Sequence, residues 1–220
     1  MTFDALLFDF DGVLIESEYL GNKQLAEWLT AEGHPISPEE SMANFMGYSG
    51  VDFLERIERF IERPIPDSFH AARAVEDDRV MAAGIDAVVG AVEFVRGLDA
   101  GLPKAVVSSS STRWIRRHLD HIGLSDAFGD HVYSGREHVT RGKPAPDLYL
   151  FAADRIGVGI DRCAIIEDSP VGATGAVASG GYVIGLTAGT HCGADHGDRL
   201  TAIGVDAVAD DFVEVARLVA

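Results

Sequence analysis

Short apolar runs rich in β-branched residues recur along the chain and predict buried strands. The clearest runs are 5–10, 104–109, 163–168 and 181–186, and weaker ones occur at 130–135 and 205–210. Between them, helical spacing of apolar residues predicts helices over 112–124, 146–158 and 169–181. Strands that alternate with helices are typical of βαβ units, so the pattern predicts an α/β core built on a parallel, Rossmann-like sheet.

The segment 18–83 departs from this alternation, because its periodicity is helical throughout. Ser37 followed by Pro38 has the composition of a helix start. A βαβ crossover needs only about a dozen residues, so this long helical stretch predicts an inserted all-helical cap. We expect a core formed by 1–15 and 84–220 and a cap formed by 16–83. The alternative is that these helices simply pack on the sheet.

Charge and composition indicate which kinds of partner the protein can bind and in which compartment it is expected. The 220 residues carry a net charge of −17, which repels DNA, RNA and anionic lipid. The two cysteines, Cys163 and Cys192, do not suggest a disulfide framework. The N-terminus does not resemble a signal peptide, and no apolar run reaches the length of a membrane span. We expect a cytoplasmic protein without nucleic-acid or membrane partners; the oligomeric state is open, with a monomer as the working expectation.

Carboxylates end two of the predicted strands, where a buried strand normally avoids them. Asp9 and Asp11 close the first run, and Glu167 and Asp168 close the run at 163–168. Closely spaced negative charges in a buried position are costly unless a cation compensates them. Aspartate pairs also arise by chance in so acidic a chain, and Asp168 alone fits a helix N-cap. The carboxylates alone therefore do not indicate a functional site, and other features of the sequence are needed to support one.

Two such features are a serine run and an isolated lysine. Ser108 ends the second predicted strand just before a helix, a position suited to binding an anion or to capping the helix. Lys143 precedes Pro144, which favours an extended backbone, and its ammonium group suits a phosphoryl oxygen; the alternative is an exposed turn lysine. Open α/β sheets bind ligands beyond the carboxyl ends of their strands. Oxygen ligands together with a phosphate favour Mg²⁺ as the cofactor.

Four motifs in this order identify a family resemblance. They are DFDGV at 9–13, Ser108, GKPAPD around Lys143, and Glu167-Asp168. Over essentially the whole chain, the sequence resembles the haloacid dehalogenase-like superfamily, and most of all its beta-phosphoglucomutase-like and sugar-phosphate phosphatase branch. The helical insertion resembles the C1 cap of that family.

The resemblance implies roles in phosphoryl transfer. Asp9 would be the nucleophile that forms an aspartyl-phosphate. Asp11 would protonate the leaving alcohol and then deprotonate the hydrolytic water. Ser108 and the backbone amide of Ser109 would hold the phosphoryl group, and Lys143 would neutralise its oxygens.

The resemblance also implies a metal site and excludes some activities. Asp9, the main-chain carbonyl of Asp11, and Asp168 would bind Mg²⁺, with Glu167 either a direct ligand or one step removed. Dehalogenases of the family use no Mg²⁺ and lack the second aspartate, so Asp11 argues against that activity. Phosphonatases carry a small residue at the same position, which makes that activity a poor match too.

The cap region departs from the mutases of the family. Mutases carry a cap histidine where this chain has Gly21, and a cap arginine where it has Gly50. Both departures favour simple hydrolysis. The turn that contains Gly47 and Tyr48 is the predicted substrate-specificity loop, and an ordinary helix–helix turn is the alternative.

The resemblance therefore implies a Mg²⁺-dependent phosphatase that acts on a small phosphate monoester, with a sugar phosphate or 6-phosphogluconate as the expected substrate by analogy. A phosphosugar mutase and a non-catalytic phosphate-sensing protein are the alternatives.

His191, Cys192 and His196 form a further cluster, which fits either a metal site or a merely polar loop. The basic stretch 113–121 fits a solvated helix or a partner contact better than a nucleic-acid site.

Overall fold

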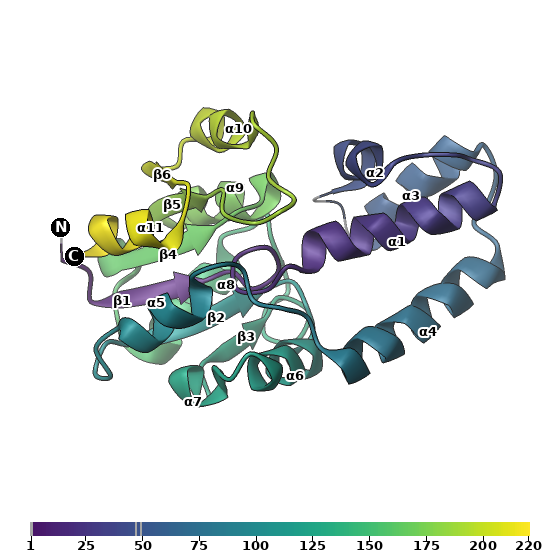
Figure 1. The fold of residues 1–220 in the computed structure, drawn as a ribbon. Helices are drawn as coiled ribbons and strands as arrows, with labels where there is room; N and C mark the ends of the chain where they lie inside the picture. Colours follow the sequence, from purple (N-terminus) through teal and green to yellow (C-terminus); the bar gives the residue numbers. More distant parts are fainter. Residues whose placement is uncertain (1, 47, 49) are drawn as a thin grey trace. The chain divides into compact units, whose positions relative to one another are not determined.

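The chain folds into two compact units that differ in secondary structure. The computed structural model describes residues 2–46, 48 and 50–220. The first unit joins Met1–Glu16 to Ile85–Ala220, and the second unit is Ser17–Gly84. Figure 1 shows that the first unit contains the sheet and that the second consists of helices. The helical unit is thus inserted into the chain directly after the first strand.

A six-stranded parallel sheet forms the centre of the first unit. Its strands lie in the order β3-β2-β1-β4-β5-β6 (Figure 1). They are β1 (Ala5–Phe8), β2 (Lys104–Ser108), β3 (Val132–Ser134), β4 (Cys163–Glu167), β5 (Tyr182–Leu186) and β6 (Ala207–Ala209). The predicted α/β fold with a parallel sheet is confirmed. The two weakest predicted strands are present as the short edge strands β3 and β6.

Helices cover both faces of this sheet because alternate strand residues point to opposite sides. On one face, Leu7, Val107 and Ile165 pack with residues of α8 (Asp147–Ile156) and α9 (Pro170–Ser179). On the other face, the Phe8 ring lies 6.1 Å from that of Phe94 and 5.6 Å from that of Phe128. The remaining helices are α5 (Ala91–Gly97), α6 (Thr112–His121), α7 (Ser125–Phe128), α10 (His196–Ile203) and α11 (Phe212–Val219), with a 3₁₀ turn at Ile160–Arg162.

The helical unit has an apolar core of its own. Its helices are α1 (Ser17–Ala31), α2 (Pro38–Phe45), α3 (Gly50–Ile61) and α4 (Asp67–Ala83). Leu29, Phe45 and Ile57 are among the buried residues of this core. The start of α2 follows from the sequence: the Ser37 side chain accepts from the Glu40 amide at 3.1 Å, and the Ser37 amide donates to Glu40 Oε2 at 2.8 Å. This reciprocal pair satisfies backbone donors that a helix start leaves open.

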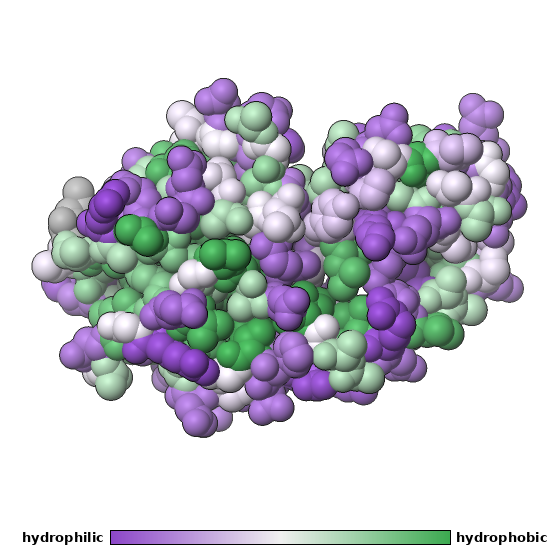
Figure 2. All heavy atoms as spheres, in the orientation of Figure 1, coloured by the Kyte–Doolittle hydropathy of each residue, from purple (hydrophilic) through white to green (hydrophobic). Residues whose placement is uncertain are grey.

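Polar residues are numerous on the surface. Hydrophilic side chains are spread over the face shown in Figure 2, with apolar patches among them. Within the described part of the chain, no helix combines the length and the apolar character that crossing a bilayer requires.

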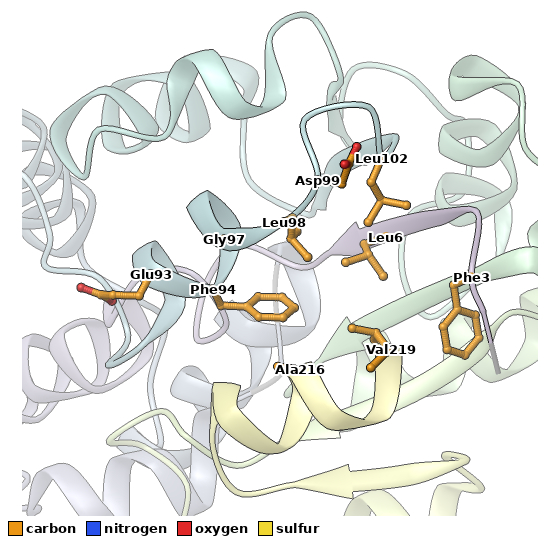
Figure 3. Close-up of a pocket in the computed structure, with 11 residues that line it drawn as sticks. Phe3, Leu6, Glu93, Phe94, Gly97, Leu98, Asp99, Leu102, Ala216 and Val219 are labelled. Atoms are coloured by element: carbon orange, nitrogen blue, oxygen red, sulfur yellow. The ribbon is translucent and has the colours of Figure 1, made fainter.

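A cavity of about 400 Å³ lies at the amino ends of β1 and β2 (Figure 3). Phe3, which precedes β1, and Leu102, which precedes β2, line it together with Phe94 of α5 and Val219 of α11. None of the described residues that line it is basic, whereas two of them, Glu93 and Asp99, are acidic. Since a phosphate group needs positive charge, this cavity is a poor phosphate site.

Helix α9 packs very closely against the segment that carries Lys143. A Cβ atom added at Gly175 would lie 2.9 Å from the carbonyl oxygen of Ala145 and 3.0 Å from that of Pro144. Side-chain carbon atoms do not approach backbone oxygens so closely without displacement. Glycine at this position therefore lets α9 fix the backbone next to Lys143.

We predict that Gly175→Ala lowers the free energy of unfolding by about 1–3 kcal/mol, because overpacking displaces the backbone of Pro144 and Ala145. Helix propensity alone would give the opposite sign, since alanine is favoured over glycine by roughly 1 kcal/mol. Urea denaturation measures the difference. Gly97→Ala in α5 is the matched control: the added Cβ meets no described atom within 4 Å, so no loss is expected. Equal stability of the two variants would contradict close packing at α9.

Candidate active site

Lys143 joins two carboxylates that come from neighbouring strands. Its Nζ atom lies 2.6 Å from Asp9 Oδ1 and 2.7 Å from Glu167 Oε1. Asp9 directly follows β1, Glu167 is the last residue of β4, and the Asp9 amide donates to the Ile166 carbonyl at 2.9 Å. The lysine side chain is only 4% exposed. The adjacency of β1 and β4 therefore builds a buried ion cluster at the carboxyl edge of the sheet.

This cluster holds more negative than positive charge. Burial raises the pKa of Asp9 well above its ordinary value of 3.8; Lys143 lowers it, while Glu167 and Asp168 raise it further. Burial and Glu167 likewise raise the pKa of Asp168 well above 3.8. Burial alone would lower the pKa of Lys143, but Asp9 and Glu167 raise it well above 10.5. Lys143 is therefore charged at neutral pH, and the carboxylates around it are under-compensated.

Glu167 has hydrogen-bond partners on both of its oxygens. Oε1 accepts from Lys143 and lies 3.1 Å from the hydroxyl of Tyr149, while Oε2 accepts from the amide of Ser169 at 2.8 Å and from its hydroxyl at 3.1 Å. A Cβ at Gly172 would lie 1.6 Å from Oε1, so the carboxylate sits directly against the first turn of α9. Glu167 is thus held by protein donors and in turn fixes Lys143.

Asp168 is bound differently from its neighbour. Its Oδ2 atom lies 2.8 Å from His191 Nε2, whereas Oδ1 is buried and has no hydrogen-bond partner among the described residues. Carboxylate oxygens of Asp9, Glu167 and Asp168 lie within 4.8 Å of one another. A buried oxygen without a donor, next to under-compensated carboxylates, fits a bound cation, and an all-oxygen set suits a hard ion such as Mg²⁺. Of the three, Asp9 and Asp168 would be the better direct ligands, because both oxygens of Glu167 already accept hydrogen bonds from protein donors.

Asp11 accepts hydrogen bonds from a different set of donors, which are neutral. Its carboxylate accepts from Ser108 Oγ at 3.1 Å, Ser110 Oγ at 2.7 Å and Trp114 Nε1 at 3.1 Å. Ser108 is buried at the end of β2, and its hydroxyl also accepts from the Ser110 amide at 2.9 Å. Ser109 is exposed beside it. The two carboxylates of the D-x-D motif are therefore held by different partners, a lysine for one and hydroxyl and indole groups for the other.

Gly12 permits the close approach of these elements. Its φ is 85°, and a Cβ there would lie 2.1 Å from Asp168 Oδ2 and 2.9 Å from His191 Cε1. Any side chain would collide with a proposed metal ligand, and the positive φ adds strain for other residues. Two independent structural reasons therefore require glycine at position 12: the close contacts and the positive φ.

Sequence reasoning missed three residues that complete the site. Tyr149, Ser110 and Trp114 hold Glu167 or Asp11, as described above. The tyrosine and the tryptophan fit the apolar periodicity of their helices, so nothing marked their polar atoms as functional. Ser110 could have been found, because it belongs to the serine run that also supplied Ser108.

The two predicted cap residues belong to the helical unit. Tyr48 is described by the structure, whereas Gly47 lies outside the described residues. Tyr48 is 45% exposed, and the Arg56 guanidinium lies 4.2 Å from the centroid of its ring. The role of both residues in substrate specificity stays a prediction.

Comparison with known proteins agrees with this geometry. Residues 3–180 match the haloacid dehalogenase-like hydrolase family. The chain belongs to this family. It is 32% identical over 186 residues to "Hexitol phosphatase A" of Escherichia coli, covering 84% of this chain and 83% of the relative. It is 27% identical over 191 residues to the E. coli "6-phosphogluconate phosphatase", covering 86% and 84%.

A solved structure supports the same assignment for the fold. A HAD family hydrolase from Deinococcus radiodurans, with bound phosphate and sodium, superimposes with a TM-score of 0.84 and 32% identity. The comparison covers 98% of this chain and 95% of that one. The family resemblance predicted from the four motifs is therefore confirmed.

The excess of negative charge in the cluster predicts how substitutions change the free energy of unfolding when a chelator removes metal ions. Lys143→Met is expected to lower the free energy of unfolding by about 3–5 kcal/mol, because it leaves buried carboxylates without their cation. Asp9→Asn is expected to raise it by about 1 kcal/mol, because it relieves repulsion while Lys143 keeps Glu167. Urea denaturation with excess EDTA measures both. A loss of stability in Asp9→Asn as large as that in Lys143→Met would mean that the Asp9–Lys143 attraction outweighs the repulsion.

Proposed function

We propose that this protein is a Mg²⁺-dependent phosphatase that hydrolyses a small phosphate monoester through an aspartyl-phosphate on Asp9. One observation carries the proposal: Asp9 and Asp11 lie together at the carboxyl edge of the sheet but are held by different partners. Asp9 is fixed by the buried ammonium of Lys143, and Asp11 by hydroxyl and indole donors. Mere binding of phosphate needs positive charge and has no use for a second carboxylate.

The two carboxylates divide the reaction between them. In the first step an oxygen of Asp9 attacks phosphorus, the ester P–O bond breaks, and the leaving alkoxide takes a proton from Asp11. In the second step Asp11 takes a proton from water, the water oxygen attacks the phosphorus of the aspartyl-phosphate, and the Asp9 carboxylate is released together with inorganic phosphate. Each step conserves charge and protons, and Asp11 ends in its starting state.

The other residues of the site bind and orient. Lys143 holds Asp9 in place and would neutralise phosphoryl oxygens. Asp9, Asp168 and the main-chain carbonyl of Asp11 would hold Mg²⁺, which supplies further charge neutralisation at the phosphoryl group when bound. Ser108 and the amide of Ser109 would bind the transferring group at the end of β2.

A sugar phosphate or a phosphorylated sugar acid is the proposed substrate class. Support comes from the names of the two relatives, a hexitol phosphatase and a 6-phosphogluconate phosphatase. In the helical unit, the exposed Tyr48 ring and the Arg56 guanidinium beside it offer stacking and positive charge for a polar anionic ligand. A mutase is not favoured, because Gly21 of α1 offers no side chain where mutases of the family carry a histidine.

The decisive measurement is phosphate release from a panel that includes hexitol phosphates, 6-phosphogluconate and 2-phosphoglycolate. We expect release that requires Mg²⁺, stops with EDTA and falls by at least about 10³-fold in Asp9→Asn and Asp11→Asn. Release that persists in Asp9→Asn would contradict the covalent route. Absence of release, with conversion of a sugar phosphate to its isomer, would show a mutase; binding without any turnover would show a phosphate sensor.

Trp114 provides a test of how Asp11 is held. Trp114→Phe keeps the ring and removes the Nε1 donor, so we expect kcat to fall about tenfold while KM changes little, because Asp11 acts mainly in the transition state. Trp28→Phe in the helical unit is the matched control and should leave kcat unchanged. Steady-state kinetics on the best substrate of the panel measures both. A change confined to KM would show that Trp114 contacts substrate instead of positioning Asp11.

A further inference from the structure

Two histidines and a cysteine meet beside Asp168, outside the set of residues that the proposed reaction uses. His191 and Cys192 lie in the loop that follows β5, and His196 is the first residue of α10. Their ligand atoms lie within 4.8 Å of one another, and Cys192 Sγ is 3.3 Å from His191 Nε2. Both histidines are buried, whereas Cys192 is partly exposed. A cation could therefore enter from the cysteine side of the cluster.

The fold holds this cluster in place before any ligand binds. The His191 ring lies between two glycines: a Cβ would lie 2.4 Å from its Cε1 at Gly189 and 2.9 Å from it at Gly12. The Cys192 amide donates to the Gly189 carbonyl at 2.9 Å. Next to them, the amide and hydroxyl of Thr190 donate to Glu16 Oε2 at 3.0 and 2.6 Å. The loop is thus anchored at Gly189 and Thr190, on the amino-terminal side of His191.

The chemistry of the three side chains favours a borderline or soft metal ion. Imidazole and thiolate are ligands of Zn²⁺, whereas Mg²⁺ prefers oxygen. In a tetrahedral Zn²⁺ site, the bond lengths place nitrogen and sulfur ligands about 3.5 Å apart, close to the 3.3 Å between His191 Nε2 and Cys192 Sγ. His196 Nε2 lies 2.5 Å from the main-chain oxygen of Asp168, the kind of contact that orients a ligating histidine. The negative net charge of the chain attracts cations to the site.

We propose that His191, Cys192 and His196 form a second metal site for a thiophilic divalent cation such as Zn²⁺, and that its occupation inhibits the phosphatase reaction through Asp168. On binding, the ligating histidine nitrogens are neutral, the Cys192 thiol becomes a thiolate, and the displaced protons pass to solvent. The ion then lies next to Asp168 Oδ2, which is 2.8 Å from His191 Nε2. Asp168 is then drawn toward the new ion and away from the Mg²⁺ site. The inhibitory effect rests on the proposed function, whereas the binding site does not.

Metal binding is measured first, without reference to activity. The Asp9→Asn variant is used, because the substitution removes one carboxylate and so weakens metal binding at the carboxylate site. It is titrated with Zn²⁺ against a chromophoric chelator in excess Mg²⁺. Co²⁺ is added in a parallel experiment, because a thiolate ligand gives a charge-transfer absorption band in the near ultraviolet. Cys192→Ser in the same background is the test variant, and Cys163→Ser is the matched control, since Cys163 is buried in β4 with its thiol directed to the Gly159 carbonyl.

We expect one Zn²⁺ per chain and a Co²⁺–thiolate band in the Asp9→Asn protein and in its Cys163→Ser form. Cys192→Ser should weaken Zn²⁺ binding at least about tenfold and abolish the band. Because Cys192 is partly exposed, its substitution does not empty the core. Absence of Zn²⁺ binding in excess Mg²⁺, or binding and a band that persist in Cys192→Ser, would overturn the site.

Inhibition is measured with Asp9 intact, in Mg²⁺ and buffered Zn²⁺. We expect Zn²⁺ to reduce phosphate release in the wild type and in Cys163→Ser, and to do so much less in Cys192→Ser. Equal inhibition of both variants would mean that Zn²⁺ acts at the carboxylate site, and would overturn the inhibitory role. A wild type that binds Zn²⁺ but releases no phosphate from any substrate would refute the proposed function and leave the metal site standing.

Discussion

The buried ammonium of Lys143 is the interaction on which the site depends. It lies between Asp9, just past β1, and Glu167, at the end of β4, so the pairing of these two strands determines where the charges meet. One lysine cannot compensate Asp9, Glu167 and Asp168 together, and burial raises the pKa of both aspartates. Repulsion between the buried carboxylates therefore remains in the cluster, and a cation bound to the remaining oxygens would reduce it. Functional sites commonly retain such local conflict at a cost in stability.

The rest of the fold brings backbone close to this charged cluster. Gly12, Gly172 and Gly175 lie where a side chain would collide with Asp168, with Glu167 and with the segment after Lys143, respectively. The three glycines belong to the first motif and to α9, which packs on the same face of the sheet as α8 and its Tyr149. Close packing makes the positions of the reacting groups depend on residues that touch no substrate.

The sequence predicted the central strands and the convergence of the four motifs because both depend on local patterns. Apolar runs mark buried strands, and polar residues at their carboxyl ends must share one edge of a parallel sheet. It did not predict that Trp114 and Tyr149 present a polar atom to Asp11 and Glu167, because the periodicity of a helix reports the apolar body of an aromatic residue and not the direction of its N–H or O–H group. Nor could spacing show that Asp168 contacts His191, since that contact depends on how the loop after β5 folds back over Gly12.

Asp168 connects two ligand sets of different chemical character. Its Oδ1 atom has no protein donor among the described residues, close to carboxylates that suit a hard cation, while Oδ2 contacts an imidazole that belongs to a nitrogen and sulfur cluster. Ligand type distinguishes metals more reliably than affinity does, because affinity for almost any nitrogen, oxygen or sulfur site rises from Mn²⁺ to Cu²⁺ and falls again at Zn²⁺. A carboxylate shared between a hard and a soft set would therefore couple the two proposed metal sites: the ion that binds Asp168 more strongly would set the position of an oxygen that the other ion needs.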